Sequence, residues 1–378
     1  MADRIYNIIA VNPGSTSTKV GYYHNDEKVW IENIHHPYTD LSKFSCIQDQ
    51  LYYRADVIEE MIKEHGVDLG TIDAFSARGG GLVACSGGVY AINTTMLRDC
   101  IKAAAGVPHP ADLAPQICKR LADKYGVPSY VVNSPDTDEL QDVARVSGMK
   151  GLYRQSHCHC LNQKEVAYRF CKEHGLKYKE TDLIVCHFGG GASVTVHHNG
   201  RMIDTSDSLI GDGPMTPTRA GILPNSVVYK MAYSDEYKDS MLRLENKLIR
   251  ETGLIDHLGT QDMKEIERRI QEEHDEYAKM IVDGMIYQFA KTIGMYSVVL
   301  HGKYEAILLT GGVMKCDYVT SRLKEYVEWI APVYVYPGEL EVAALAGGAY
   351  RALIGEEEVM EYTGVPVFDG FHSKRYGI

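Results

Sequence analysis

The chain has 378 residues, of which 45% are hydrophobic and 24% charged, so it can bury sizeable cores, and its length favours two domains. Its 39 basic and 51 acidic residues give a net charge of −12, which argues against nucleic acid or an anionic membrane as the main partner. Nine cysteines without a regular framework fit a reducing cytoplasm, and we find neither a signal pattern nor a long apolar run. We therefore expect a cytoplasmic protein that meets any anionic substrate with local positive groups.

The first predicted element is a pair of strands joined by a turn of small residues. Residues 5–11 are an apolar run, 12–19 form the turn, and 20–23 form a second extended run. Gly14 has no Cβ, and the hydroxyls that follow it, together with the charge of Lys19, suit phosphate oxygens. The spacing is not that of a Walker A loop, since a strand and not a helix follows. A hairpin without a ligand is an equally good interpretation of this stretch alone.

A candidate anion contact follows further along the chain. Residues 28–34 form a third predicted strand, and the apolar positions of 51–62 have helical spacing before Gly66. A short apolar strand at 72–76 leads to Arg78 and three glycines. A guanidinium at the end of a strand can bind a carboxylate or a phosphate with two hydrogen bonds. A surface arginine in a flexible loop would produce the same pattern.

The middle of the chain alternates helix and strand, with a helix predicted at 113–125 and a strand at 129–132. Histidine and cysteine alternate at 157–160, but this spacing is wrong for a zinc knuckle, in which two to four residues separate the ligand cysteines. A single functional histidine is therefore favoured over a metal site.

The opening element then recurs about half a chain later. An apolar run at 183–188 is followed by a glycine turn at 189–193 and by further strands at 194–197 and 201–204. This repetition predicts a duplicated α/β unit. Two such turns that face each other across a cleft would clamp a polyphosphate from both sides.

The rest of the chain adds a second arginine and another glycine turn. An irregular loop at 211–221 carries Arg219, and loops of this kind are usually functional or mobile. A buried strand at 306–310 ends in two glycines, a pattern that can pass close to a nucleotide. The final predicted elements are a strand at 333–336 and a helix that begins at Glu341.

Taken together, these motifs resemble those of butyrate kinases, which belong to the acetokinase family within the superfamily of acetate and sugar kinases, heat-shock cognate proteins and actin. The resemblance extends along nearly the whole chain. The segments that carry it are 12–19, 78–80, 138–140, 161–164, 187–194, 213–214 with Arg219, and 309–312.

The resemblance implies an α/β fold of the duplicated ribonuclease H-like (actin-like ATPase) kind, with two domains around a nucleotide cleft. Residues 1–155 plus 342–378 would form an N-terminal acyl and phosphate domain, and 156–341 a nucleotide-binding domain. It further implies domain closure that excludes water, and a homo-oligomer.

The implied activity is transfer of the ATP γ-phosphoryl group to butyrate or a related short- or branched-chain carboxylate. The products are an acyl phosphate and ADP, the reaction is reversible, and Mg²⁺ is required. No protein nucleophile is needed because the carboxylate attacks directly and in line, so that positioning and charge stabilisation carry the chemistry.

The resemblance also assigns site residues. The catalytic positions are Arg78, His159, Arg219 and Asn133, and the substrate-binding residues are Arg78 and His109. The nucleotide-binding residues are Asn12, Ser15, Ser17, Lys19, His187, Gly189, Gly190, Gly191, Asp262, Gly311, Gly312 and Val313, and the metal-binding residue is Glu341.

One of these positions departs from the family pattern. Members of the family normally carry an aspartate where this chain has Asn133. An amide cannot supply a negative charge, so the affinity for metal should fall, with Asp136 or Asp138 as partial substitutes. Asn133 therefore keeps one alternative open, a kinase-fold protein that binds nucleotide but turns over little. A sugar kinase of the same superfamily is a further alternative. Sugar kinases use a carboxylate base, whereas two arginines suit an anionic acceptor.

Overall fold

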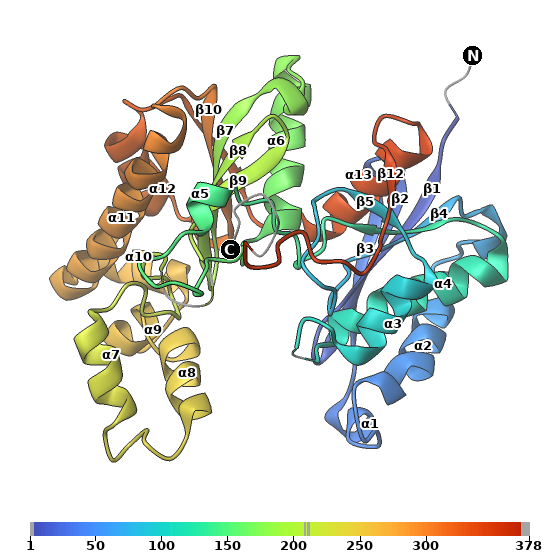
Figure 1. Cartoon of the computed structure of the whole chain (residues 1–378), viewed down its shortest axis with the longest axis horizontal. Coiled ribbons are helices and arrows are strands. Elements are labelled where there is room, and N and C mark those ends of the chain that lie inside the picture. Colours follow the sequence, from blue (N-terminus) through green and yellow to red (C-terminus); the bar gives the residue numbers. More distant parts are fainter. Residues whose placement is uncertain (1–3, 107, 208, 210–211, 372–378) are drawn as a thin grey trace. The chain divides into compact units, whose positions relative to one another are not determined.

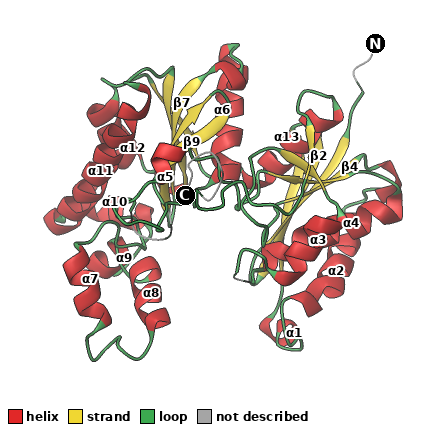
Figure 2. Ribbon diagram, viewed as in Figure 1, coloured by secondary structure: helices red, strands yellow, loops and turns green. Residues whose placement is uncertain are grey.

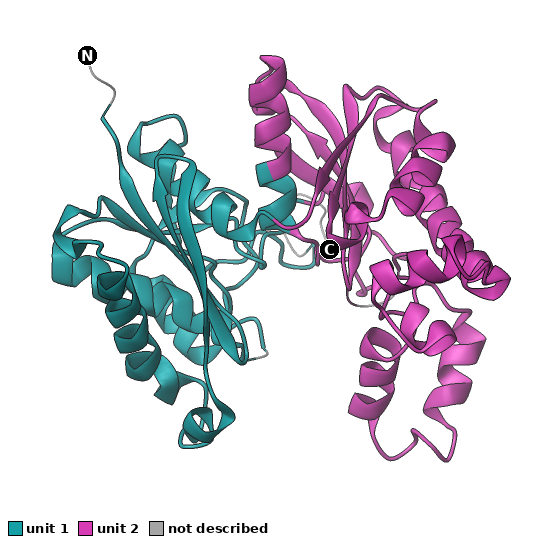
Figure 3. Ribbon diagram, turned by 180° about the vertical axis from the view of Figure 1, so that it is seen from behind, with its two compact units in different colours: residues 1–139, 160–165, 340–378 teal, residues 140–159, 166–339 magenta. Residues whose placement is uncertain are grey.

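The structure is a computed structural model that describes residues 4–106, 108–207, 209 and 212–371. Gly211, the first residue of the predicted irregular loop, lies outside the described residues. The chain divides into two compact units (Figure 3). Unit 1 comprises residues 1–139, 160–165 and 340–378, and unit 2 comprises 140–159 and 166–339. Residues 140–155, which the sequence-based boundary placed in the first domain, cluster with unit 2. The functional labels of the two domains stay predictions.

Unit 1 is built on one sheet of seven strands in the order β12-β5-β6-β4-β1-β2-β3. Figure 2 draws the strands in yellow. The strands are β1 (Asn7–Pro13), β2 (Ser17–His24), β3 (Glu27–His35), β4 (Ala74–Ala77), β5 (Val89–Ala91), β6 (Ser129–Val132) and β12 (Val359–Glu361). The helices are α1 (Tyr38–Leu41), α2 (Leu51–Glu64), α3 (Thr94–Lys102), α4 (Leu113–Tyr125) and α13 (Glu341–Leu353). The strands β1, β2 and β3 pair antiparallel, while β4 lies parallel to β1 and β6 parallel to β4.

The central strands β1, β4 and β6 are buried on both faces, and successive side chains of each strand point to opposite faces. Along β1, Ile9 and Val11 belong to a core that includes residues of α2, α3 and α4. The alternate residues Ile8 and Ala10 belong to a second core, formed with α13. Figure 1 shows α2, α3 and α4 gathered on one side of the sheet and α13 apart from them. The near-continuous apolar character of the first run follows from this double burial.

Unit 2 is built on a five-stranded sheet in the order β11-β10-β7-β8-β9. The strands are β7 (Asp182–Phe188), β8 (Ala192–His198), β9 (Arg201–Thr205), β10 (Ala306–Gly311) and β11 (Val333–Pro337). The helices are α5 (Asp142–Arg145), α6 (Cys160–His174), α7 (Asn225–Ala232), α8 (Met241–Arg250), α9 (Leu254–Leu258), α10 (Met263–Gln271), α11 (Glu276–Ser297) and α12 (Asp317–Val327), with a 3₁₀ turn η6 (Gly312–Lys315). The first six residues of α6 cluster with unit 1.

The two sheets share one topology. The strands β6-β4-β1-β2-β3 have the same order as β11-β10-β7-β8-β9, with three antiparallel strands on one side and parallel strands added on the other. The predicted duplication is therefore confirmed. The predictions did not include β5 and β12, each of which has only three residues and thus little periodic signal.

The long helix α11 provides the core of unit 2, as its apolar stripe predicted. Met285, Phe289 and Ile293 are fully buried, and Ile281 packs against the same cluster. No helix in the described part of the chain combines the length and the apolar composition that a membrane span requires.

Candidate active site

The turn between β1 and β2 presents polar groups at the end of the sheet of unit 1. The two strands pair with Asn12 opposite Lys19, and the amide of Gly14 donates to the carbonyl of Ser17 at 2.7 Å, which closes the turn. Ser15 is exposed, and the ammonium group of Lys19 is exposed and forms no hydrogen bond or ion pair with the described residues. The turn therefore has a hydroxyl and a positive charge available for an anion.

A buried arginine, which the sequence analysis missed, supports this turn. Arg54 of α2 has no exposed surface. Its Nη1 donates to the carbonyl of Gly14 at 3.0 Å and to Thr18 Oγ1 at 3.1 Å, and its Nη2 donates to the carbonyl of Ser15 at 3.0 Å. The available signal was a charged residue on the apolar stripe of α2, three residues after Leu51.

Three predicted site residues of unit 1 lie together. The Asn12 Nδ2 donates to Glu341 Oε2 at 2.8 Å, and Arg78 Nη2 lies 4.0 Å from Glu341 Oε1. The side chains of Arg78 and Glu341 are 29% and 27% exposed, so a ligand can reach both. The end of β1, the end of β4 and the first turn of α13 thus bring an amide, a cation and a carboxylate to one place.

His109 lies near enough to Arg78 to feel its charge, and a backbone N–H two residues further along holds its ring. Its Nδ1 accepts a hydrogen bond from the amide of Ala111 at 3.1 Å, which fixes the proton of a neutral ring on Nε2. Partial burial, followed by the positive charges of Arg78 and Arg54, lowers its pKa. A neutral histidine with an Nε2 donor is therefore expected at neutral pH.

Asn133, at the end of β6, forms hydrogen bonds within the fold. Asn133 is 2% exposed. Its backbone is left-handed, with φ of 42°, a conformation that asparagine tolerates well. The side-chain Oδ1 accepts a hydrogen bond from the backbone N–H of Gly88 at 2.8 Å, and the backbone N–H of Asn133 donates to the carbonyl of Gly88 at 2.9 Å. The side chain thus anchors β6 to β5, and its predicted catalytic role stays a prediction.

Asp136 and Asp138, the predicted partial substitutes for the family aspartate, are also buried. Asp136 accepts hydrogen bonds from Ser134 Oγ at 2.7 Å and from the amide of Leu82 at 3.2 Å, and burial raises its pKa. Asp138 is 5% exposed. Both positions restrict any direct contact with a metal.

The residues present fit a magnesium ion that arrives with a nucleotide. Among the described residues, no group of three or more His, Cys, Asp or Glu side chains converges as a metal cage. Mg²⁺ usually keeps several waters and binds through one or two carboxylates plus substrate phosphates. Glu341, with its carboxylate oriented by Asn12, provides such a donor.

In unit 2, two histidines and a serine form a compact cluster. The rings of His159 and His187 stack with centroids 3.8 Å apart and an interplanar angle of 4°. The His159 Nδ1 lies 2.8 Å from Ser193 Oγ, and Ser193 is paired with His187 across β7 and β8. His187 Nε2 in turn lies 3.9 Å from Glu339 Oε1. The stack and the serine together fix the orientation of His159.

Arg219 lies directly against the second glycine turn. A Cβ at Gly191 would come within 2.7 Å of its guanidinium carbon, so only glycine allows this approach. The carbonyl of Gly190 accepts from Thr216 Oγ1 at 2.6 Å and from Thr218 Oγ1 at 2.9 Å, which ties the arginine-bearing loop to the turn.

The guanidinium of Arg219 has unused donors. Its Nε and Nη1 are buried, and no acceptor among the described residues bonds to them. Burial lowers its pKa, which Asp207 partly opposes, but an arginine remains charged at neutral pH. A buried, charged group with unsatisfied donors is unfavourable unless an anion completes it.

The residues predicted for adenosine lie on separate elements of unit 2. Gly311 has φ of 100°, and a Cβ there would lie 2.0 Å from the carbonyl oxygen of Phe188, so the ends of β10 and β7 approach closely. Gly312 and Val313 begin η6. Asp262 is exposed and caps α10 by accepting from the amide of Lys264 at 2.9 Å. The adenosine contact of Asp262 stays a prediction.

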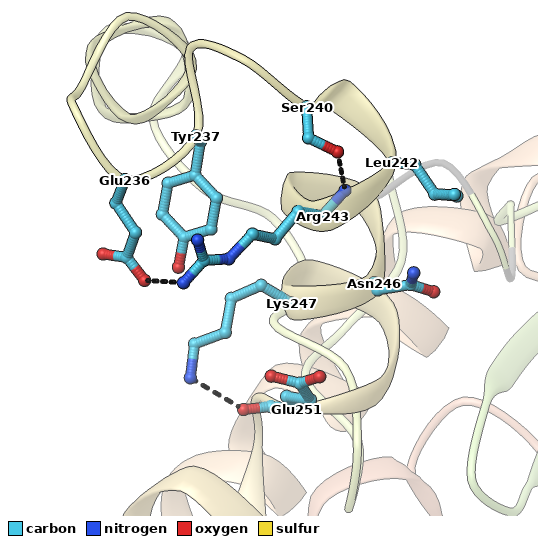
Figure 4. A pocket seen from close by; sticks show the side chains of 8 residues that line it. All are labelled: Glu236, Tyr237, Ser240, Leu242, Arg243, Asn246, Lys247 and Glu251. Atoms are coloured by element: carbon cyan, nitrogen blue, oxygen red, sulfur yellow. Dashed lines mark hydrogen bonds and ion pairs between the residues drawn. The ribbon is translucent and has the colours of Figure 1, made fainter.

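The described residues of unit 2 line at least two surface pockets. One, of about 460 Å³, adjoins η6 and is lined by Met314, Lys315, Asp317, Thr320, Lys324, Val335 and Pro337. The other, of about 380 Å³, lies beside α8 (Figure 4), where Arg243 pairs with Glu236 at 3.7 Å and Lys247 donates to the carbonyl of Glu251 at 3.1 Å. No predicted site residue lines either pocket, but the first lies next to the predicted adenosine turn.

Comparison with solved structures identifies the fold. An acetate kinase from Entamoeba histolytica superposes with a TM-score of 0.71 at 18% identity, covering 90% of this chain and 98% of that one. A propionate kinase from Francisella tularensis gives a TM-score of 0.69 at 17% identity, with coverage of 90% and 98%. At these identities the likeness shows the fold alone, and it confirms the predicted actin-like ATPase fold.

Comparison of the sequence with known proteins identifies the family. The model of the acetokinase family matches residues 131–325. A protein named "Probable butyrate kinase" from Clostridium botulinum is 42% identical over 357 residues, which cover 94% of this chain and 99% of that protein. A protein of the same name from Bacteroides thetaiotaomicron is also 42% identical, with the same coverage. The chain belongs to the acetokinase family.

Proposed function

We propose that this chain is a butyrate kinase. It transfers the γ-phosphoryl group of ATP to the carboxylate of butyrate or of a related short- or branched-chain acid, and it releases an acyl phosphate and ADP in a reversible reaction. Membership of a family of carboxylate kinases supports this proposal, as do the relatives named probable butyrate kinases.

The single observation that carries the proposal is the guanidinium of Arg219, whose buried Nε and Nη1 have no acceptor among the described residues. A carboxylate that attacks a triphosphate brings two anions together, so positive charge must be placed where they meet. Arginine binds carboxylate and phosphoryl oxygens with a rigid pair of donors. Arg219 in unit 2 and Arg78 in unit 1 are the two residues that we assign to this task.

The remaining site residues position the reactants. The turn at 12–19 and the glycines 189–191 hold the phosphates, and His159, oriented by Ser193, donates to an oxygen of the transferred group. His109 helps to bind the carboxylate. The attacking oxygen comes from the substrate itself, so the protein lowers the barrier by orientation and by charge stabilisation.

We propose that Mg²⁺ is the required metal and that Glu341, whose carboxylate is oriented by Asn12, holds it with the nucleotide. When bound, the ion would neutralise part of the charge on the phosphates. Glu341 is supported in this role by its exposure and by the hydrogen bond that orients its carboxylate.

We further propose a cytoplasmic homo-oligomer. All nine cysteines are free, which supports a reducing compartment. Light scattering behind a sizing column would test the oligomeric state, and a mass equal to that of one chain would contradict it.

The alternative of a nucleotide-binding paralogue with little turnover, which rested on Asn133, receives no support from the comparisons. A sugar kinase is disfavoured because the two arginines that we assign suit an anionic acceptor. A hydroxamate assay for acyl phosphate, run with ATP and acetate, propionate, butyrate, isobutyrate and valerate, separates these readings. We expect acyl phosphate with an optimum at four carbons. Nucleotide binding without any product would contradict the proposal.

A further inference from the structure

We propose that Arg54 is a positioning residue of the phosphate-binding turn at 12–19. It does not contact the substrate. From α2 it holds the turn in shape by hydrogen bonds and supplies a buried positive charge. This inference rests on the proposed function, because it assumes that the turn binds the phosphates of the nucleotide.

The hydrogen bonds of Arg54 are concentrated on the turn. Besides its bonds to Gly14, Ser15 and Thr18, Nη1 lies 3.5 Å from the carbonyl of Ser17, and Nε donates to Gln50 Oε1 at 3.0 Å. One planar guanidinium therefore fixes four residues of the turn, at positions 14, 15, 17 and 18, relative to α2. A lysine, which carries its donors on a single nitrogen, cannot reach the same set of acceptors.

This arrangement determines where the amides of the turn point. In a trans peptide unit the carbonyl and the following N–H point in opposite directions, and the described chain contains no cis peptide bond. Because the carbonyls of Gly14 and Ser15 point at Arg54, the amides of Ser15 and Thr16 point away from it. Both residues are exposed, and neither amide is used in a hydrogen bond among the described residues. Two adjacent amide donors of this kind suit a phosphate oxygen.

The charge of Arg54 is not neutralised within the part of the chain that the structure describes. Arg54 is completely buried, and all of its acceptors are uncharged carbonyl, amide or hydroxyl oxygens. Its neighbour His36, which shares Thr18 Oγ1 at 2.8 Å, has its pKa lowered to about 4 by burial and by Arg54, so it is neutral at pH 7. An unpaired buried cation is costly, and an anion on the far side of the turn would offset that cost.

Arg351 of α13 provides a matched comparison in the same unit. Its side chain is also mostly buried, but it pairs with Glu165 at 3.4 Å and with Glu357 at 3.0 Å. A structural role alone would therefore be expected to come with carboxylate partners. Arg54 differs because its partners are the backbone of a candidate ligand site.

The test measures KM for ATP, KM for butyrate, equilibrium binding of ATP and thermal unfolding for three variants. We expect Arg54→Lys to raise KM for ATP about tenfold and Arg54→Gln about 100-fold, while KM for butyrate changes much less. The control Arg351→Gln should lower thermal stability without changing KM for ATP. An unchanged KM for ATP in both Arg54 variants would overturn the inference.

If the Arg54 variants do not fold, Thr18→Val decides the question, because it keeps Arg54 and removes one acceptor from it. A severalfold rise in KM for ATP, with KM for butyrate unchanged, would support the inference, and unchanged values for both would overturn it. Failure of the wild-type protein to bind ATP or to form acyl phosphate would instead overturn the proposed function.

Discussion

The two small-residue turns of the molecule each lie against an arginine, but the two arginines are in opposite states. Arg54, below the turn of unit 1, is fully buried, and each of its three nitrogens donates to a carbonyl, amide or hydroxyl oxygen. Arg219, against the turn of unit 2, has two buried nitrogens without an acceptor among the described residues. One guanidinium thus holds a backbone turn, and we propose that the other is available to a ligand.

The difference shows how to separate supporting residues from reacting ones in this fold. A satisfied buried group affects a ligand only through the backbone that it holds, so its loss should weaken binding. An unsatisfied buried group gains its partner only when the ligand is present, so its loss should affect the reaction itself. Variants at the two turns should therefore differ in which kinetic constant they change.

The largest effect is expected for Arg219→Gln. Loss of the guanidinium removes the positive charge that we assign to the transferring phosphoryl group, so kcat should fall about 1,000-fold. The hydroxamate assay measures this directly. Arg250→Gln is the control, since Arg250 is an exposed arginine whose charge is felt at Arg219, and it should retain activity. Activity of Arg219→Gln close to that of the wild type would remove the distinction between the two turns.

A smaller loss is expected for Gly191→Ala, which keeps Arg219 but displaces it. The added Cβ would lie 2.7 Å from the guanidinium, and a shift of about 1 Å at a reacting group can lower the rate by about tenfold to 100-fold. Gly284→Ala in α11 is the control, because nothing lies within 4 Å of its Cβ position. That control should keep full activity and gain about 0.5–1 kcal/mol of stability. Equal activity of both variants would show that the contact between Gly191 and Arg219 is unimportant.

A gain is expected for Asn133→Asp. An aspartate preserves the left-handed backbone and the acceptor for Gly88, and it adds the negative charge that an amide lacks. The concentration of Mg²⁺ needed for half-maximal activity should fall severalfold, and turnover should rise. Titration of Mg²⁺ at saturating ATP and butyrate measures both. A wild type that is already fast, and a variant with no gain, would show that the family aspartate is not needed in this chain.

The smallest effect concerns stability in acid. Because the pKa of His36 is about 4 in the folded state and about 6.5 in the unfolded state, the unfolded chain takes up a proton first as the pH falls. Stability from this site is therefore complete above about pH 6.5 and is lost progressively toward pH 4. His36→Gln should flatten the fall in the thermal midpoint over this range. Parallel curves for the wild type and the variant would contradict a buried neutral His36 beside the turn of unit 1.

Much of the architecture could be predicted from sequence because its signals are local. The apolar runs that became β1, β7 and β10 are buried on both faces, and each ends in a glycine-containing turn that is visible in the chain. The repeat of strand, small-residue turn and strand was sufficient to predict the duplicated fold. The same local pattern pointed to the turns of the candidate site.

The supporting contacts could not be predicted, because they join residues that are distant in the chain. Arg54 was visible only as a charged residue on an apolar helical stripe, and no local rule indicates that its acceptors lie around residue 15. The hydrogen bond of Asn133 to Gly88 spans 45 residues, and the bond of Asn12 to Glu341 spans 329. Such pairs depend on the order of strands in the sheet, which the sequence pattern constrains only loosely.

The most direct test compares Arg54→Lys with Arg219→Lys, since both variants keep the charge and lose the planar fork. We predict that Arg219→Lys lowers kcat by about 100-fold with KM for ATP near the wild-type value. For Arg54→Lys we predict the reverse, a raised KM for ATP with kcat much less affected. The same pattern of kcat and KM in both variants would contradict the account.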